Sequence, residues 1–417
     1  MSIYHDGQTT PLLNVFVYLF RKALESDYVS CHLNEWIDLI WGFKQKGENA
    51  KKAHNIFLPN MYETSWTQQT LKDPRRRAEI EAIMCHVGQI PTQLFFAEHP
   101  QRNIRPKRNS VQTAIVQLPY TDIKIASMYH SKTNGHLMLS LVSSNSNQVV
   151  ASLELSLADH STNIINNISS ELQTDITEID TFVTNNEIVM LQSNGKLIHM
   201  LDEIIDSVHP ELSYVSTFAI SKHFTAAVSD NTTLNLFSPD ACIRYSIPFY
   251  GDAILCCAIS ETFKVAVCGT LSGLIICSLY EGKKINAIQF DSDLKPIKIL
   301  ITNSWGFIVT YAIKKSIQGK PKPYLIVHTI NGKLLRSVEI QIPIVSWYSF
   351  SSFDDFDYLV ISNEQGKLHL IEVFYLNIED PFYRCNKNIV SICYLKKPKV
   401  IAALIEDGNI AFLPIDV

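Results

Sequence analysis

Turn-forming residues recur at a nearly constant interval through most of the chain, and this spacing limits the folds that the chain can adopt. From about residue 110 onward, a turn cluster links short β-type segments at seven positions: Asn147, Gly195, Asn231, Gly273, Gly319, Gly366 and Gly408. Successive turns lie 36 to 48 residues apart, with a mean of 43.5 residues. A four-stranded propeller blade takes about 40–45 residues. The spacing therefore predicts a seven-bladed β-propeller.

Two consecutive repeats show four strands each. The first repeat predicts strands at Ile254–Ser260, Lys264–Gly269, Leu274–Leu279 and Lys284–Gln289. The second predicts strands at Ile297–Thr302, Gly306–Ile313, Tyr324–Ile330 and Lys333–Ile340. The pair Asn331 and Gly332 between the last two strands is typical of a two-residue hairpin.

The last repeat, Ile389–Pro414, has room for three strands. We expect Gln112–Leu118 to supply the fourth strand, because closing the ring removes the unpaired sheet edges. The propeller then occupies residues 106–417. A pair of β-sandwiches is the alternative fold, since strand spacing fits both and no Trp-Asp dipeptide occurs.

Residues 1–105 have a helical period instead. Large apolar residues recur there at three- and four-residue spacing: Leu33, Trp36, Ile37, Ile40 and Trp41. The pattern predicts a helix that begins at Ser30, ends near Gly47 and buries Trp36.

A second helix has clearer limits. Asp73 is a suitable N-cap, Pro74 fits the first helical position and Gly88 ends the pattern. Its predicted apolar stripe consists of Ile80, Ile83, Met84 and Val87.

Composition excludes several classes of protein. Apolar residues make up 46% of the chain, which allows a large core and excludes general disorder. The net charge is −5, divided as +3 for residues 1–110 and −8 for the rest, so we expect no nucleic-acid partner. We expect no membrane-spanning helix, because no run of about 18 uncharged apolar residues occurs. No secretory signal is visible at the N-terminus.

The nine cysteines are an odd number and form no C-x-x-C pair. Five lie in apolar segments and are interpreted as buried thiols of a reducing compartment: Cys256, Cys257, Cys268, Cys277 and Cys393.

Motifs for catalysis or metal binding are missing from the sequence. No zinc-type spacing, phosphate-binding loop or nucleophile elbow occurs, so we expect no catalytic, cofactor or metal site. Asp354, Asp355 and Asp357 resemble a calcium run, but the required Gly and Glu are absent, and we interpret them as a solvated loop.

The alternative is a propeller enzyme of the hydrolase or lyase type with a site in the central channel. Such a site needs polar side chains from several blades. The predicted inner strands Ile254–Ile259, Ile297–Thr302 and Ile389–Tyr394 are largely apolar, which disfavours it.

The run from Arg21 to Gly47, RKALESDYVSCHLNEWIDLIWGFKQKG, closely resembles the C-terminal part of the BEACH domain, whose pattern is close to REALES-x-YVS-x-x-LHEWIDLIFGYKQ-x-G. The resemblance covers about residues 12–102. It continues at Asn55–Phe57, Tyr62–Glu63, Gly88–Leu94 and Glu98–Arg102.

The chain departs from the family in length, because a whole BEACH domain and the PH-like domain before it are much longer than residues 1–105. We expect Met1 to begin inside the domain, through a truncated gene model or as a remnant whose apolar faces need a partner. The motif residues carried over are interpreted as mainly structural: Glu25, Tyr28, Trp36, Asp38, Gly42, Lys44, Gln45, Gly88, Gln89 and Pro91.

The resemblance also implies architecture and function. BEACH proteins, including the neurobeachin-like members, commonly carry a WD-repeat propeller directly after this domain. They are non-enzymatic scaffolds, so we expect a cytoplasmic chain that works in vesicle trafficking, lysosome-related sorting or autophagy. Its partners would be trafficking or autophagy adaptors, with peripheral contact to endosomal or lysosomal membranes and no small-molecule substrate.

Two basic clusters are candidate partner-binding residues. They consist of Arg75, Arg76 and Arg77, and of Arg102, Arg105, Lys107 and Arg108. Such clusters suit an acidic partner or anionic lipid, although a simple solvated surface is the alternative for both. Trp36–Leu39 fits the pattern of autophagy-receptor ligands, but those ligands bind as strands, and the helical period favours a helix here.

Overall fold

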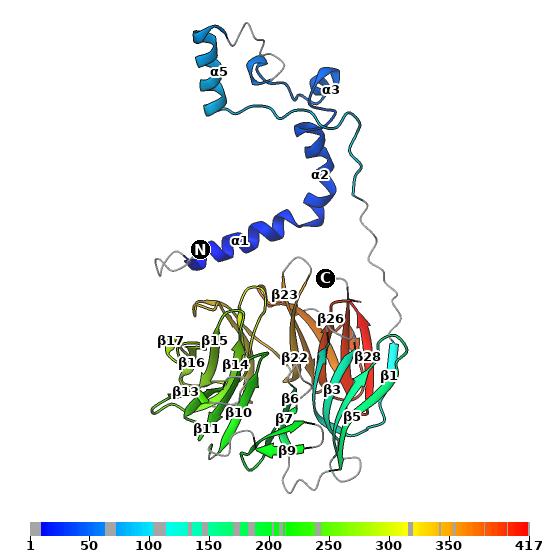
Figure 1. Cartoon of the computed structure of the whole chain (residues 1–417), viewed down its shortest axis with the longest axis vertical. Coiled ribbons are helices and arrows are strands. Elements are labelled where there is room, and N and C mark those ends of the chain that lie inside the picture. Colours follow the sequence, from blue (N-terminus) through cyan, green and yellow to red (C-terminus); the bar gives the residue numbers. More distant parts are fainter. Residues whose placement is uncertain are drawn as a thin grey trace. The chain divides into compact units, whose positions relative to one another are not determined.

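The computed structural model describes residues 10–62, 72–102, 114–131, 136–143, 149–169, 176–181, 188–201, 204–207, 212, 214–237, 243–315, 320–341, 343–352, 356–378, 380–397 and 399–415. The chain forms two compact units, Met1–Arg108 and Asn109–Val417, and each is described by itself (Figure 1).

The N-terminal unit is helical, with a long extended segment at its end. Its elements are α1 (Thr10–Leu24), α2 (Asp27–Ile40), α3 (Gly47–Lys52), the 3₁₀ turn η1 (Pro59–Met61) and α5 (Pro74–His86). Residues 89–102 contain no helix or strand.

The predicted limits of the helix around Trp36 are wrong. Ser26, in an extended conformation, caps α2 by accepting a hydrogen bond from the Val29 backbone N–H at 3.3 Å. Ser30 lies inside the helix, where its N–H donates to the Ser26 carbonyl. Gly47 begins α3 with a φ of +68°, because the chain leaves helical geometry already at Trp41.

The second helix has the predicted limits. Asp73 accepts a hydrogen bond from the Arg75 backbone N–H at 3.0 Å, and Pro74 is the first helical residue. Gly88 follows the helix with a φ of +91°, a conformation that favours glycine. The predicted stripe is only partly buried, since Ile80 is in the core while Val87 is exposed.

The C-terminal unit is a seven-bladed β-propeller, which confirms the predicted fold and excludes the pair of sandwiches. Seven antiparallel four-stranded sheets surround a common centre (Figure 1). The strands of the first three blades are β2 (Ile123–His130), β3 (Leu137–Ser143), β4 (Val149–Leu155), β5 (Thr162–Ser169); β6 (Ile176–Thr181), β7 (Ile188–Gln192), β8 (Leu197–Leu201), β9 (Ile204–Ser207); and β10 (Val215–Ile220), β11 (Thr225–Ser229), β12 (Thr233–Phe237), β13 (Ile243–Pro248).

The remaining blades follow the same plan, with the first strand of each blade innermost. Their strands are β14 (Ile254–Ser260), β15 (Val265–Thr270), β16 (Gly273–Ser278), β17 (Lys284–Gln289); β18 (Leu294–Ile301), β19 (Ile308–Lys314), β20 (Lys322–His328), β21 (Leu334–Glu339); β22 (Ile344–Ser351), β23 (Asp357–Asn363), β24 (Lys367–Glu372), β25 (Tyr383–Arg384); and β26 (Ile389–Leu395), β27 (Val400–Ile405), β28 (Asn409–Pro414).

The last blade takes its fourth strand from the start of the unit. β1 (Ala114–Gln117) pairs antiparallel with β28, with Ile115 opposite Ala411 and Val116 opposite Ile410. The sequence placed this closing strand at Gln112–Leu118, of which the structure describes residues 114–118. Pairing with β1 gives the final sheet four strands, the same number as in every other blade.

The predicted turns mark one type of connection. Gly195, Asn231, Gly273, Gly366 and Gly408 lie where the second strand of a blade connects to the third. Asn147 and Gly319 lie outside the described residues. The core fills the spaces between neighbouring blades, where Leu141 and Leu153 of the first blade share one cluster with Ala402 and Leu404 of the last.

Candidate functional site

Two regions carry candidate functional residues, and the first is the end of α2 with the extended segment that packs on it. Asp38 is 1% exposed and accepts a hydrogen bond from the His99 backbone N–H at 3.0 Å. Gly42 lies so close to Asp38 that an added Cβ would stand 2.4 Å from the Asp38 Cα. The amide of Gln93 donates to the Gly42 carbonyl at 3.1 Å.

Gln45 links the end of α2 to the extended segment by further hydrogen bonds. Its buried amide donates to the carbonyls of Ile40 and Pro91, the latter at 2.7 Å. Asn55 donates to the carbonyls of Leu39, at 2.8 Å, and Lys44, at 3.1 Å. The bonds to Leu39 and Ile40 satisfy carbonyls that the end of α2 leaves without helical partners.

The apolar side of α2 faces away from the rest of the N-terminal unit. Leu33, Trp36 and Ile40 recur at helical spacing and are 46%, 47% and 41% exposed. Cys31 and Asp38, on the opposite side, are buried. The prediction that Trp36 is buried is therefore wrong, because the unit covers the more polar side of this helix.

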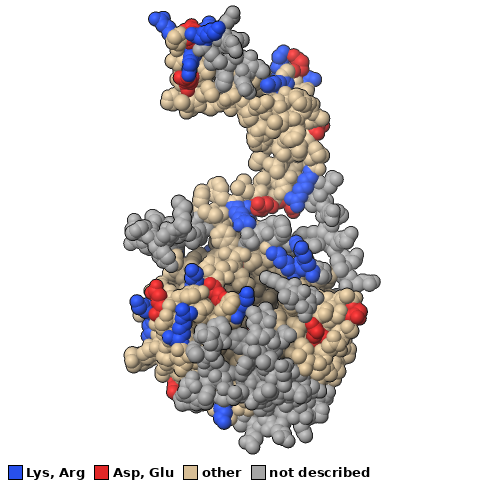
Figure 2. Space-filling view, in the orientation of Figure 1, with Lys and Arg blue, Asp and Glu red and all other residues tan. Residues whose placement is uncertain are grey.

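Large apolar side chains are exposed in other parts of the N-terminal unit as well. Seventeen of the thirty large hydrophobic side chains that are exposed among the described residues lie between Phe16 and Phe96. The face seen in Figure 2 is mostly uncharged over α2, while Lys, Arg, Asp and Glu gather at α3 and α5. Exposed apolar patches of this kind mark surfaces that bind other molecules.

The structure describes four of the seven basic residues that are candidates for partner binding. Arg75, Arg76 and Arg77 lie in the exposed first turn of α5, where Arg77 pairs with Glu81 at 2.8 Å. Arg102 is exposed at the end of the extended segment. Arg105, Lys107 and Arg108 lie outside the described residues.

The remaining motif residues are mostly on the surface. Glu25, Tyr28, Gln89 and Pro91 are exposed. Lys44 is half-buried, with its Nζ 5.4 Å from the centre of the Phe43 ring. Of the ten residues taken from the resemblance, Asp38, Gly42 and Gln45 thus have the closest contacts.

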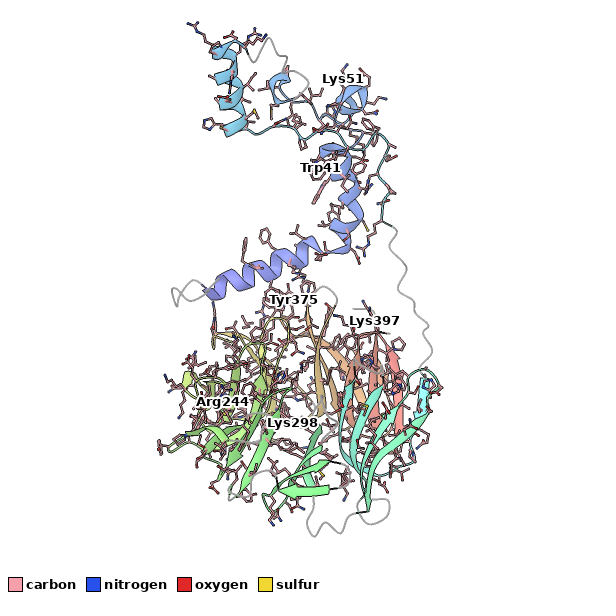
Figure 3. The ribbon with its side chains drawn as sticks, viewed as in Figure 1. Trp41, Lys51, Arg244, Lys298, Tyr375 and Lys397 are labelled. Atoms are coloured by element: carbon pink, nitrogen blue, oxygen red, sulfur yellow. The ribbon has the colours of Figure 1, made fainter. Side chains whose placement is uncertain are left out.

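The second region is the central channel of the propeller, a cavity of about 840 Å³. Its wall combines residues from the inner strands of all seven blades, and Figure 3 shows Lys298 in the interior of the propeller. The three inner strands that were predicted from the sequence are largely apolar. Glu178, Asp180 and Thr217 line the channel from two other blades. The sequence shows these charges beside apolar residues, since Ile179 follows Glu178 and Lys298 lies between Ile297 and Ile299.

The two principal charges of the channel lie in surroundings that favour their neutral forms. Burial raises the pKa of Glu178, against the opposing effects of the Phe218 N–H, the Thr217 hydroxyl and the positive charge of Lys298. Burial also lowers the pKa of Lys298, although the charge of Glu178 opposes this shift. Lys298 is exposed to the channel, but protein surrounds the channel, so neither charge is solvated as in bulk water.

The thiols predicted to be buried are buried and unpaired. Burial raises the pKa of Cys256, in the channel wall, to about 12, and holds that of Cys257 well above its usual range. Thiols in this state are poor nucleophiles near neutral pH.

The interpretation of Asp357 as part of a solvated loop is wrong. This residue is 1% exposed, and its carboxylate accepts hydrogen bonds from the backbone N–H groups of Ser304 and Trp305 and from the hydroxyls of Thr302 and Ser351. It joins the turn after β18 to the turn after β22. Asp354 and Asp355 lie outside the described residues.

The described ranges contain neither a metal-type cluster of side chains nor a membrane-spanning helix. No group of three or more His, Cys, Asp and Glu side chains there is close enough together to hold a metal ion. The helices in those ranges also lack the length and apolar character needed to cross a bilayer.

Comparison with known proteins concerns the N-terminal unit. The family model of the Beige/BEACH domain matches residues 10–102. The proteins named "Putative neurobeachin homolog" in Caenorhabditis briggsae and in Caenorhabditis elegans are each 47% identical to this chain over 88 residues. The matched stretch covers 21% of this chain and 4% of each relative.

The family match includes the Asp38, Gly42 and Gln45 contacts, and the structure places a complete ring of blades after it. Residues 10–102 are therefore a segment of a BEACH domain, followed in this chain by a seven-bladed β-propeller.

Proposed function

We propose that this chain is a non-enzymatic protein-interaction scaffold in membrane and vesicle trafficking. The observation that carries the proposal is the uncovered apolar face of α2, formed by Leu33, Trp36 and Ile40. An amphipathic helix normally gains its stability by burying such a face. Since the N-terminal unit leaves this apolar face exposed, we infer that another protein binds to it.

The partner that suits this surface has an apolar groove or an amphipathic helix of its own. The exposed side chains recur at three- and four-residue spacing, which is the pattern by which a helix enters a hydrophobic groove. Trp36 is a large aromatic anchor of the type that dominates protein interfaces. The helical conformation of Trp36–Leu39 also makes strand-type binding to an autophagy receptor the less suitable mode.

The finer assignments rest on the BEACH match and on the relatives' names. We propose a cytoplasmic protein that takes part in lysosome-related sorting or autophagy and contacts endosomal or lysosomal membranes peripherally. Arg75 and Arg76 are exposed and have no ion-pair partner among the described residues, so they are the basic side chains offered to an acidic partner or lipid headgroup. A scaffold role also agrees with the unreactive thiols of the channel.

The test compares recruitment of full-length variants to the vesicle fraction of cells. A variant with Leu33→Ser and Trp36→Ser should lose recruitment and keep the melting temperature of the wild type, because both side chains are exposed. Tyr250→Ser, at a propeller residue that is 89% exposed, is the matched control and should behave as the wild type. Equal recruitment of all three proteins would exclude this face as the binding surface.

A second pair of variants separates protein from lipid. Arg75→Ser with Arg76→Ser should reduce sedimentation of the full chain with anionic phosphatidylserine vesicles if the basic turn contacts lipid. The α2 variant should leave that sedimentation unchanged, since its partner is a protein. Loss of vesicle binding in the α2 variant would instead make its apolar face a membrane-inserting surface.

A further inference from the structure

The central channel has the features of a binding site that is independent of the scaffold surface on α2. Each inner strand is the free edge of its sheet, so backbone N–H and C=O groups on that edge have no partner within the sheet. The channel volume of about 840 Å³ lies in the range of pockets that enclose small organic ligands. The wall therefore offers main-chain hydrogen bonds along its length.

The charged side chains occupy equivalent positions in the blades. In the second to fifth blades the inner strand shifts register against its neighbour, and the residue after the shift is Glu178, Thr217, Cys256 and Lys298 in turn. Glu178 and Lys298 are three blades apart in a ring of seven. Their backbones therefore lie on well-separated walls of the channel, and the Glu178 carboxylate extends toward Thr217 of the third blade.

Neither charge is neutralised by a close partner. No ion pair within 4.0 Å joins Glu178 and Lys298, both of which belong to the described part of the chain. The Lys298 ammonium donates to the Val345 carbonyl at 3.1 Å, which leaves two of its three N–H groups for other acceptors. The Glu178 carboxylate accepts from the Thr217 hydroxyl at a long 3.4 Å and from the Phe218 backbone N–H, and both donors are uncharged.

Asp180 adds to the negative side of the channel. It lies on the same strand as Glu178, lines the channel and accepts a hydrogen bond from Ser127 at 2.7 Å. The apolar side chains of Leu255 and Ile297 are 38% and 41% exposed and line the wall beside Cys256 and Lys298.

We propose that the channel binds a short peptide with free ends, its carboxylate at Lys298 and its ammonium at Glu178. Such a ligand carries both charges that the walls require. Its backbone can pair with the free strand edges, and its side chains can cover Leu255 and Ile297. A simple anion would satisfy Lys298 alone, and a simple cation would satisfy Glu178 alone.

The raised pKa of Glu178 and the lowered pKa of Lys298 agree with this site. Both shifts have burial as their main cause, so the walls of the channel solvate the two charges poorly. A bound zwitterion supplies each charged group with an opposite charge in a region of low dielectric, where charge-assisted hydrogen bonds are strong.

The experiment is calorimetric titration of the full chain with trialanine, with N-acetyl-trialanine and with trialanine amide. Trialanine should give saturable binding, and each blocked peptide should bind roughly tenfold more weakly, as expected for one lost charge-assisted hydrogen bond. Lys298→Met should bind trialanine and its amide equally well. Glu178→Gln should lose most of the preference for a free amino end.

Lys333→Met, which removes an exposed lysine outside the channel, is the matched control and should leave all three affinities unchanged. If the channel variants do not fold, the comparison of the three peptides on the wild type decides the matter alone. Absence of saturable binding, equal binding of free and blocked peptides, or full displacement of trialanine by acetate at similar concentration would each overturn the proposal. Vesicle recruitment through α2 is measured separately, so the two proposals fail independently.

Discussion

At the scale of single residues, Asp357 is the buried carboxylate that joins two blades. One carboxylate oxygen accepts from the Ser304 N–H and the Ser351 hydroxyl, and the other accepts from the Trp305 N–H and the Thr302 hydroxyl. Burial raises its pKa, and these four donors oppose that shift. The residue is thus important for stability because both of its oxygens face donors.

We predict that Asp357→Asn destabilises the propeller by about 2–4 kcal/mol. In either orientation of the new amide, its NH₂ group faces a backbone N–H and leaves that donor unsatisfied. Urea unfolding of the full chain measures the loss. Asp291→Asn is the control, because Asp291 is 76% exposed and its ion pair with Lys314 contributes little. A similar small effect for both variants would contradict the bridging role.

His328 gives a prediction for pH. Its side chain is 3% exposed and stacks on Phe290, and burial lowers its pKa to about 4. Below pH 6.5 the unfolded chain takes up a proton that the folded chain binds only near pH 4, so stability falls as the pH decreases through this range. From pH 7.5 to 5.0 this residue should cost about 2 kcal/mol.

The measurement is urea unfolding at pH 7.5 and pH 5.0 for the wild type and for His328→Phe, which keeps an aromatic ring beside Phe290. The wild type should lose more stability on acidification than the variant does. Identical losses would show that His328 does not carry the effect.

At the scale of elements, the exposure of α2 changes what its large aromatic residue contributes. A buried Trp truncated to Ala costs about 3–5 kcal/mol. Because Trp36 is 47% exposed, we predict that Trp36→Ala costs less than about 1 kcal/mol in the full chain. Ile80→Ala, at a residue that is 5% exposed, should cost more. Thermal melts of the two variants compare these losses of stability. A larger loss for Trp36→Ala than for Ile80→Ala would mean that α2 buries Trp36.

The closing strand gives a second test at this scale. Ile115 is 61% exposed, whereas Val116 packs on the cluster shared by the first and last blades. We predict that Val116→Asp lowers the melting temperature of the propeller markedly, because it places a charge in that cluster. Ile115→Lys on the same strand should have little effect. Equal melting temperatures for both variants would show that β1 does not close the ring.

At the scale of the whole molecule, the N-terminal unit has many exposed apolar groups for its size. Its core is small, and seventeen large hydrophobic side chains remain exposed. We predict that residues 1–105 expressed alone do not form a soluble monomer with a cooperative melt, because too little apolar surface is buried to offset the entropy of folding. Analytical ultracentrifugation and calorimetry test this, and a monomer with a sharp transition would refute it.

The sequence by itself determined the propeller, because its information is local and repeated. Each blade is a run of hairpins with alternating apolar strands, and turn residues such as Gly195 and Gly366 mark the period without long-range knowledge. The caps at Asp73 and Gly88 are local in the same way. The BEACH segment was likewise recognisable from one continuous run of residues.

The tertiary structure alone decided which faces are covered and which side chains meet. The helical period at Leu33, Trp36 and Ile40 shows that α2 is amphipathic, but only the packing of the unit shows which side is covered. Asp357 receives three of its four donors from a turn about fifty residues earlier, and Glu178 and Lys298 line one channel although 120 residues of chain separate them. Contacts over such distances depend on how the blades close into a ring, and local sequence patterns do not contain that information.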